Sequence, residues 1–302
     1  MNRYASKALY IPHIKACTMK KIAIFAKVHD PRCLGVAEEL IAWLDAKGFC
    51  PLVEAHLARH LKCKYSVRSH DIPDQADLVV VLGGDGTLIS VARLVGDRQV
   101  PILGVNLGSL GFLTEITLGE MYPALECCLL GDYEVSERMM LRASILRDDK
   151  EIEVHQVLND VVINKGAMAR IVDMETVVDD RYLTTFKADG LIISTPTGST
   201  GYSLSANGPI IHPELDCLVI TPICPHTLTN RPIVVASDAR ISITMQSQNE
   251  DIFLTLDGQV GVKLKYGDTI RIRRAEHRTK LVRSRSKDYF EVLRTKLKWG
   301  ER

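Results

Sequence analysis

The chain has 302 residues, of which 46% are apolar, so it is long enough for two packed domains and is not largely disordered. With 38 Lys and Arg residues against 37 Asp and Glu residues, it has no global charge that would favour nucleic acid or an anionic membrane as a partner. No apolar run reaches the roughly 18 residues of a membrane-spanning helix, and no secretory signal is present, which predicts a cytoplasmic protein.

Eight cysteines are scattered along the chain without any C-x-x-C pair, so we expect reduced thiols rather than a disulfide framework or a zinc site. Residues 1–18 hold basic residues and no acidic one, a composition found both in transit peptides and in plain extensions. The strand-like segment after Met19 favours a disordered extension ahead of a domain that begins at residue 19.

Residues 19–130 are predicted to form a Rossmann-like α/β domain. The apolar run 22–26 is typical of a parallel strand, and Asp30-Pro31 then supplies the N-cap and first turn of a helix that should stop at Gly48. A second buried strand is expected at 78–82, followed by a glycine turn and a helix, and a third strand at 101–105. This alternation indicates an open, doubly wound sheet.

Residues 131–285 alternate apolar and polar side chains with a period of two, which predicts a mostly antiparallel β domain. The clearest hairpin runs through 172–178, turns at Asp179-Asp180 and returns through 182–186. Further strands are expected around 241–245, 252–256 and 270–272. An apolar stripe in 286–302 predicts a C-terminal helix that returns to pack on the α/β domain.

Residues 263–302 hold 14 Lys and Arg residues against 5 Asp and Glu residues. A nucleic-acid surface is one interpretation of this excess. Because Arg271, Arg273 and Arg274 alternate with apolar residues, we favour the solvent-facing side of an edge strand.

The first segment suited to chemistry holds Gly83, Gly84, Asp85, Gly86 and Thr87 between a predicted strand and helix. Glycines permit backbone conformations that a Cβ would forbid and bring N–H groups close to a phosphate at a helix N-terminus. A carboxylate beside phosphate is repelled unless it meets a cation or takes a proton, so Asp85 is interpreted as helping to hold Mg²⁺ or as accepting a hydroxyl proton. The alternative is a simple turn with a capping aspartate.

The second segment, 189–209, begins with Asp189, ends with Gly208-Pro209 and is dense in hydroxyl side chains. Uncharged donors of this kind can replace the hydration of a phosphate or a ribose. The alternative is an ordinary Ser/Thr-rich turn, but the two sharp boundaries favour a binding loop.

The third segment is Asn159-Asp160, at the edge of an apolar strand. An amide can form hydrogen bonds with the edge of an adenine base, and a carboxylate can accept hydrogen bonds from ribose hydroxyls. Adjacent strand residues face opposite sides, so the two serve one ligand only if the strand bends or ends there. The alternative is a turn with an Asx cap.

Together the three segments, including Asp-Gly-Leu-Ile-Ile-Ser-Thr-Pro-Thr-Gly-Ser-Thr-Gly-Tyr-Ser from residue 189, resemble the NAD kinase family over about residues 20–298. The glycine motif alone is shared with phosphofructokinases and with lipid kinases of the diacylglycerol and sphingosine type, so the long run decides the family. The resemblance implies transfer of the γ-phosphoryl group of ATP to the 2′-hydroxyl of the adenosine ribose of NAD. A lipid kinase and a dinucleotide sensor without turnover are the alternatives.

The resemblance also implies roles for single residues. Asp85 would accept the proton of that hydroxyl, the three glycines would line the phosphates, and Asn159 and Asp160 would hold the nucleoside. Asp160 stands where the family usually has Glu, Lys187 where many members have Arg, and Gly201 where many have Ala. The further implied binding residues are Thr87, Arg170, Lys187, Asp189, Thr197, Thr200, Gly201, Tyr202, Ser203, Leu204, Ser205 and Gln259.

NAD and ATP are the expected small-molecule partners, with neither nucleic acid nor a membrane. No side-chain cluster in the sequence resembles a metal cage, so Mg²⁺ is expected to arrive with ATP. The site should lie between the two domains. The family implies a homo-oligomer, commonly a tetramer, in which subunits complete one another's sites.

Overall fold

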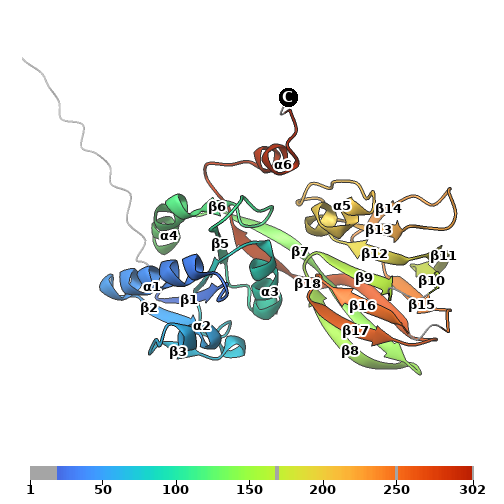
Figure 1. Ribbon diagram of the computed structural model, residues 1–302, viewed down its shortest axis with the longest axis horizontal. Coiled ribbons are helices and arrows are strands. Elements are labelled where there is room, and N and C mark those ends of the chain that lie inside the picture. The colour runs from blue at the N-terminus through green and yellow to red at the C-terminus, as the bar shows by residue number, and fades with distance from the viewer. Residues whose placement is uncertain (1–18, 167–169, 249–250, 301–302) are drawn as a thin grey trace, which may run out of the picture.

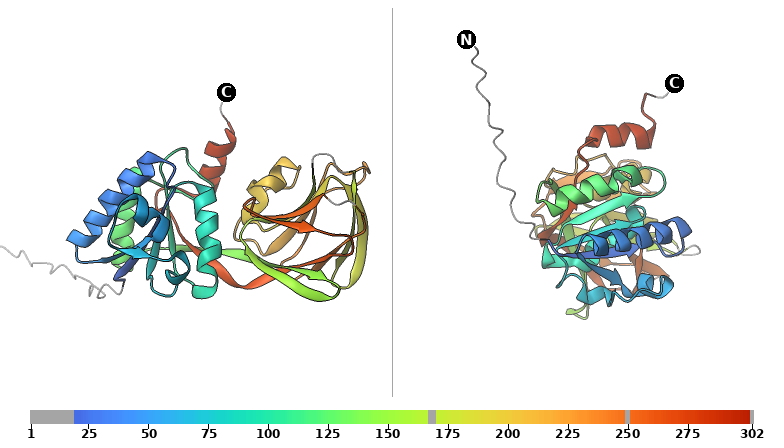
Figure 2. Two further views of the ribbon diagram at one scale, coloured as in Figure 1. Left: turned by 60° about the horizontal axis from the view of Figure 1, so that its bottom comes forward. Right: turned by 90° about the vertical axis from the view of Figure 1, so that its left-hand side faces the viewer.

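The computed structural model describes residues 19–166, 170–248 and 251–300, so the predicted extension 1–18 lies outside the described residues. The described chain forms an α/β domain and a β domain, which are joined by two long strands (Figures 1 and 2). Within these ranges, no helix has the length and apolar character needed to cross a membrane.

A parallel sheet in the order β5-β4-β1-β2-β3 forms the centre of the α/β domain, as the alternation predicted. Its elements are β1 (Lys21–Ala26), α1 (Pro31–Ala46), β2 (Cys50–Glu54), α2 (Ala55–His60), β3 (Ser66–Val67), β4 (Leu78–Leu82), α3 (Asp85–Val95), β5 (Ile102–Asn106), β6 (Ile116–Thr117) and α4 (Met121–Leu129). Asp30 caps α1 by accepting a hydrogen bond from the Arg32 backbone, and the helix ends before Gly48, whose φ is +78°. The sequence did not predict β2, α2 and β3, because segments this short have no sustained periodicity.

Two sheets packed face to face form the β domain. One has the order β14-β13-β12-β9-β16-β17, and the other contains β11-β10-β15-β18 with β7 and β8. The elements are β7 (Val135–Arg147), β8 (Lys150–Val157), β9 (Asp160–Lys165), β10 (Val172–Val178), β11 (Arg181–Ala188), β12 (Gly190–Ser194), α5 (Tyr202–Ser205), β13 (Cys217–Ile223), β14 (Ile233–Ala236), β15 (Ile241–Met245), β16 (Ile252–Leu256), β17 (Val260–Leu264) and β18 (Thr269–Val282). The predicted hairpin is confirmed, with β10 and β11 paired around a turn at Asp179 and Asp180.

Strands β7 and β18 pair with each other and extend from one domain to the other (Figure 2). Leu281 of β18 pairs with Ile102 of β5, so β18 also belongs to the sheet of the α/β domain. Because β18 lies between β15 and β7, the prediction that its arginines occupy an edge strand is wrong. Their side chains are nevertheless exposed, since they face away from the core between the sheets.

The C-terminal helix α6 (Tyr289–Leu297) occupies the predicted region and lies between the two domains in Figure 2. The Tyr289 hydroxyl donates to the carbonyl oxygen of Ile211 at 3.3 Å, and the Lys296 ammonium lies 5.6 Å from the centre of the Phe112 ring. The helix therefore contacts loops of both domains.

Candidate active site

The glycine segment connects the buried strand β4 to helix α3. A Cβ at Gly83 would lie only 2.9 Å from Thr87 Oγ1, whereas Gly84 faces open space. None of Gly83, Gly84 and Gly86 has a positive φ, so at Gly83 it is the lack of space for a Cβ, and not a left-handed backbone conformation, that favours glycine. No side chain caps the N-terminus of α3, which leaves that end suited to an anion.

Asp85, the first residue of α3, is bound to the loop 112–114. Its Oδ1 accepts hydrogen bonds from the Leu113 and Thr114 backbone N–H groups at 3.1 and 3.0 Å and from Thr114 Oγ1 at 2.9 Å. Its Oδ2 accepts from the Phe112 backbone N–H at 2.8 Å. Oδ2 accepts only this one hydrogen bond from the described chain, so it keeps acceptor capacity for a substrate hydroxyl.

A cavity of about 280 Å³, which we call the glycine pocket, is lined by Gly83, Gly84 and Asp85 together with basic side chains. The basic residues are Lys27, which follows β1, Arg32 of α1 and Lys296 of α6. Arg32 is paired with Asp30 at 2.8 Å. Lys27 and Lys296 could not be predicted from the sequence, because a single lysine carries no local signal of a site.

A second cavity, of about 350 Å³, is lined by Asn159, Asp160, Gly201, Tyr202 and Asp257, among others, and we call it the Asn-Asp pocket. Strand β9 begins at Asp160, so Asn159 stands just before it, and the two residues line one cavity. The Oδ1 atom of Asn159 is buried without a hydrogen-bond partner in the described chain. Buried polar atoms are normally paired, so this oxygen is available to a ligand.

Asp257, in the turn between β16 and β17, has a fully buried side chain. It accepts hydrogen bonds from the backbone N–H groups of Asn159 at 2.6 Å and Leu158 at 3.1 Å. Burial, reinforced by the negative charge of Asp257, raises the pKa of Asp160 to about 7. Asp160 therefore keeps its proton to a much higher pH than an exposed aspartate does.

This pKa predicts how stability depends on pH. In the unfolded chain Asp160 should titrate near its ordinary pKa of about 3.9, so the unfolded state releases the proton first as pH rises. The contribution of Asp160 to stability is complete below about pH 4 and is lost as pH rises to about 7. Asp160→Asn has no proton to release at this position. In urea unfolding, the free energy of unfolding of the variant relative to that of the wild type should therefore increase as pH rises from 5 to 8. Parallel pH profiles would contradict the raised pKa.

Three side chains, Arg93, Asp257 and Gln259, join the two pockets, and we call them the interdomain clamp. Arg93 of α3 pairs with Asp257 at 2.9 Å and donates to Gln259 Oε1 at 2.7 Å. Gln259 Nε2 donates to the Gly86 carbonyl at 2.7 Å. The turn between β16 and β17 is thereby fixed to α3, the helix that begins in the glycine pocket. Arg93 and Asp257 could not be predicted from the sequence, because they pair across 164 positions of the chain.

The hydroxyl-rich segment is largely bonded to protein. Thr195 Oγ1 donates to the Leu158 carbonyl at 2.6 Å, Ser199 Oγ to the Pro196 carbonyl at 2.6 Å, and Ser203 Oγ lies 3.1 Å from Thr221 Oγ1. Most of these hydroxyls therefore shape the loop. The exceptions matter for a ligand: Thr197 Oγ1 is buried without a partner in the described chain, and Tyr202 and Ser205 are exposed.

The loop also approaches Asn159 closely. A Cβ at Gly198 would lie 2.2 Å from the Asn159 carbonyl oxygen, so glycine is required there. A Cβ at Gly201 would lie 3.7 Å from Asp160 Oδ2, so the absence of a side chain at Gly201 enlarges the Asn-Asp pocket. Thr200 donates back to the Thr197 carbonyl, and Leu204 is half-buried.

Lys187, Asp189 and Arg170 line neither pocket. Asp189 precedes β12 at the end opposite Ser194, and Ser194 is the register partner of Asp160. Lys187 lies 3.7 Å from Asp173, and Asp189 lies 3.2 Å from Lys165. The predicted site residues that do line one of the two pockets are Gly83, Gly84, Asp85, Asn159, Asp160, Gly201 and Tyr202.

Comparison with known proteins gives consistent matches. Residues 22–133 match the ATP-NAD kinase N-terminal domain, and residues 158–284 match the ATP-NAD kinase C-terminal domain. The NAD kinase of Geotalea daltonii is 81% identical, and that of Geobacter metallireducens 73% identical, each over 94% of this chain and 100% of the relative. The structure of yeast NADH kinase complexed with NADH has a TM-score of 0.87 and 27% identity, with 94% of this chain and 89% of that chain covered. An NAD kinase from Archaeoglobus fulgidus in complex with ATP has a TM-score of 0.71 and 25% identity, with 91% and 99% covered.

Proposed function

The chain belongs to the ATP-NAD kinase family, and we propose that its two pockets bind the two substrates of one phosphoryl transfer. The reaction moves the γ-phosphoryl group of ATP to the 2′-hydroxyl of the adenosine ribose of NAD and gives NADP and ADP. The matches favour this activity over the lipid kinase and the non-catalytic sensor. The assignment of one substrate to each pocket rests on the clamp, which fixes the glycine pocket beside the Asn-Asp pocket.

In this proposal the glycine pocket holds the triphosphate of ATP. The uncapped N-terminus of α3 and the ammonium groups of Lys27 and Lys296 neutralise its charge, which is most of what phosphoryl transfer requires. Asp85 Oδ2 takes the proton of the attacking hydroxyl.

Mg²⁺ belongs to the ATP substrate in this proposal. Over residues 19–166, 170–248 and 251–300, no group of three or more His, Cys, Asp or Glu side chains could hold a metal ion. Mg²⁺ commonly binds through substrate phosphates and one or two carboxylates, and Asp30 and Asp85 line the glycine pocket. The metal would add charge neutralisation to that of the basic side chains.

The Asn-Asp pocket would hold the adenosine half of NAD, with the unpaired Asn159 oxygen accepting from the adenine amino group. Asn159→Ala should therefore raise the KM for NAD about 10- to 100-fold and change kcat much less, since the contact is made in both ground and transition states. Steady-state kinetics with an NADP-specific dehydrogenase as the readout tests this. Asn230→Ala, outside both pockets, is the control, and an unchanged KM for Asn159→Ala would remove Asn159 from the site.

We also propose a homo-oligomer, commonly a tetramer in this family, in which Lys187, Asp189 and Arg170 of one subunit reach the dinucleotide held by its neighbour. This arrangement would reconcile their predicted role with their separation from both pockets of their own chain.

The oligomer proposal predicts complementation between defective subunits. An Asp85→Asn chain co-expressed with a Lys187→Ala/Asp189→Ala chain should regain NAD kinase activity, because mixed oligomers contain some sites with all groups intact. Affinity tags on each chain isolate the mixed oligomers. The three substitutions placed on one chain serve as the control and should give no such gain with either parent variant. Inactive mixed oligomers would contradict shared sites.

A cytoplasmic location is part of the same proposal. All seven cysteines in the described ranges are free thiols, as expected in a reducing compartment.

A further inference from the structure

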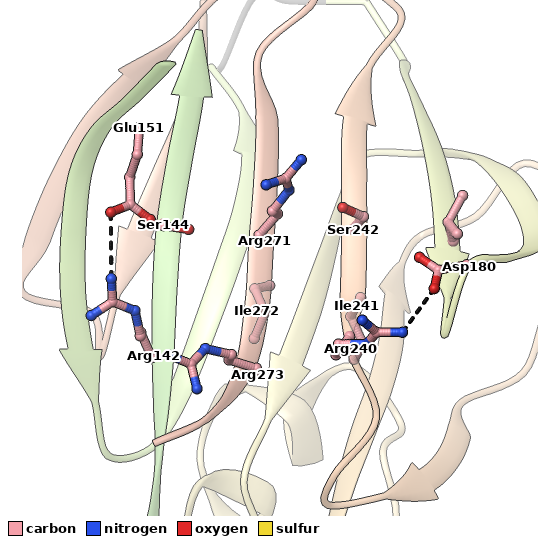
Figure 3. A pocket seen from close by; sticks show the side chains of 11 residues that line it. Arg142, Ser144, Glu151, Asp180, Arg240, Ile241, Ser242, Arg271, Ile272 and Arg273 are labelled. Carbon is pink, nitrogen blue, oxygen red and sulfur yellow. Dashed lines mark hydrogen bonds and ion pairs between the residues drawn. The ribbon is translucent and has the colours of Figure 1, made fainter. Parts of the chain in front are cut away.

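Four arginines line a hollow of about 420 Å³ on the outer face of the sheet that contains β7, β18 and β15 (Figure 3). They are Arg142 of β7, Arg271 and Arg273 of β18, and Arg240, which precedes β15. The hollow shares no lining residue with the glycine pocket or the Asn-Asp pocket. It is therefore separate from the machinery of the phosphoryl transfer.

The sheet register places two of these arginines, Arg142 and Arg273, directly against each other. Like charges at such positions destabilise a sheet. Arg271 lies between Ser144 of β7 and Ser242 of β15, whose short side chains leave its guanidinium open. The strand pairing thus holds positive charges side by side instead of alternating them with acids.

The acidic side chains of the hollow stand at its two sides. Glu151 lies 3.4 Å from Arg142, and Asp180 lies 2.7 Å from Arg240, as the dashed lines in Figure 3 mark. Arg271 has no carboxylate within ion-pair distance in the described chain, and the nearest for Arg273 is Glu276, which is 88% exposed at 3.8 Å. Four cations face two lining acids, so the centre of the hollow keeps a positive surplus.

We propose that this hollow is a second anion site, which binds a linear chain of three or more phosphates, either free or carried by a nucleoside. Guanidinium groups bind phosphate oxygens through paired hydrogen bonds, and the two serine hydroxyls add donors. Because neighbouring strands lie about 4.8 Å apart, the arginines extend over three strands and match an extended oligoanion better than a single phosphate. A bound anion also relieves the repulsion between Arg142 and Arg273.

The test is calorimetric titration of the full chain with tripolyphosphate and, separately, with a non-hydrolysable ATP analogue. Arg271→Gln/Arg273→Gln should weaken the arginine-dependent binding step by about tenfold or more, and Arg271→Lys/Arg273→Lys should lie between it and the wild type. If the Gln double variant binds tripolyphosphate more weakly, the hollow recognises the free phosphate chain. If only its binding of the ATP analogue is weakened, the hollow recognises a nucleotide. Arg59→Gln, an exposed arginine of the other domain, is the matched control and should bind like the wild type.

Two further measurements separate binding from folding. The Gln double variant should keep the kcat and KM of NAD phosphorylation, and tripolyphosphate should raise its Tm less than that of the wild type. The single variant Arg271→Gln repeats the titration with Arg142 and Arg273 unchanged. Identical isotherms for wild type and both Gln variants would overturn the proposal. A change of oligomeric state without loss of anion binding would also overturn it, and would assign the hollow to a contact between subunits.

Discussion

Asp85→Asn should lower kcat for NAD phosphorylation by about 10²- to 10⁴-fold while the KM for NAD changes little. The substitution removes the basic oxygen proposed to take the proton of the attacking hydroxyl. It leaves the Asn-Asp pocket, which holds the acceptor substrate in our proposal, unaltered. Steady-state kinetics with varied NAD at saturating ATP measures both constants, and near-wild-type turnover would remove Asp85 from the reaction.

A second variant distinguishes the loss of proton transfer at Asp85 from a displacement of the loop 112–114. Any orientation of an amide at position 85 brings its NH₂ group against backbone N–H groups of Phe112, Leu113 or Thr114, so Asp85→Asn should also cost about 1–3 kcal/mol of stability. Thr114→Val removes one hydrogen bond from Asp85 Oδ1 but leaves the carboxylate. If Asp85 acts on the proton, Thr114→Val should retain most of the wild-type kcat.

Asp257→Asn should lower the free energy of unfolding by about 3–5 kcal/mol, because it leaves Arg93 without its charge partner in a buried environment. The new amide cannot satisfy Arg93 and the backbone N–H groups of Leu158 and Asn159 together. Asn tolerates the φ of +51° at this position, so backbone strain does not account for the loss. We expect kcat to fall as well, since the turn that carries Gln259 is no longer fixed to α3.

Urea unfolding measures this loss, and Asp132→Asn is its matched control. Asp132 pairs with Arg285 at 2.6 Å, but both side chains are more than half exposed, so breaking that pair should cost less than about 1 kcal/mol. A loss for Asp257→Asn no larger than the loss for Asp132→Asn would show that the clamp does not hold the domains together.

Much of the architecture follows from local pattern. The apolar run of β4, the Asp30 cap of α1 and the alternation through β10, β15 and β16 are each produced by residues close in sequence, and the structure confirms them. Strand β18 shows the limit of this reasoning. Its alternating arginines indicate one exposed face, but only the pairing with β15 and β7 decides that the strand is central.

By itself the sequence determined the family and the order of the two domains, and it singled out Asp85, Asn159 and Asp160 as candidate site residues, because each motif is contiguous and its chemistry follows from a few neighbouring residues. Only the tertiary structure decided which groups meet. It brings Lys296 to the glycine pocket, pairs Arg93 with Asp257, and leaves Lys187 beyond both pockets. The physical reason is that charge pairing and burial depend on distance in space, and these groups are separated by up to hundreds of residues along the chain.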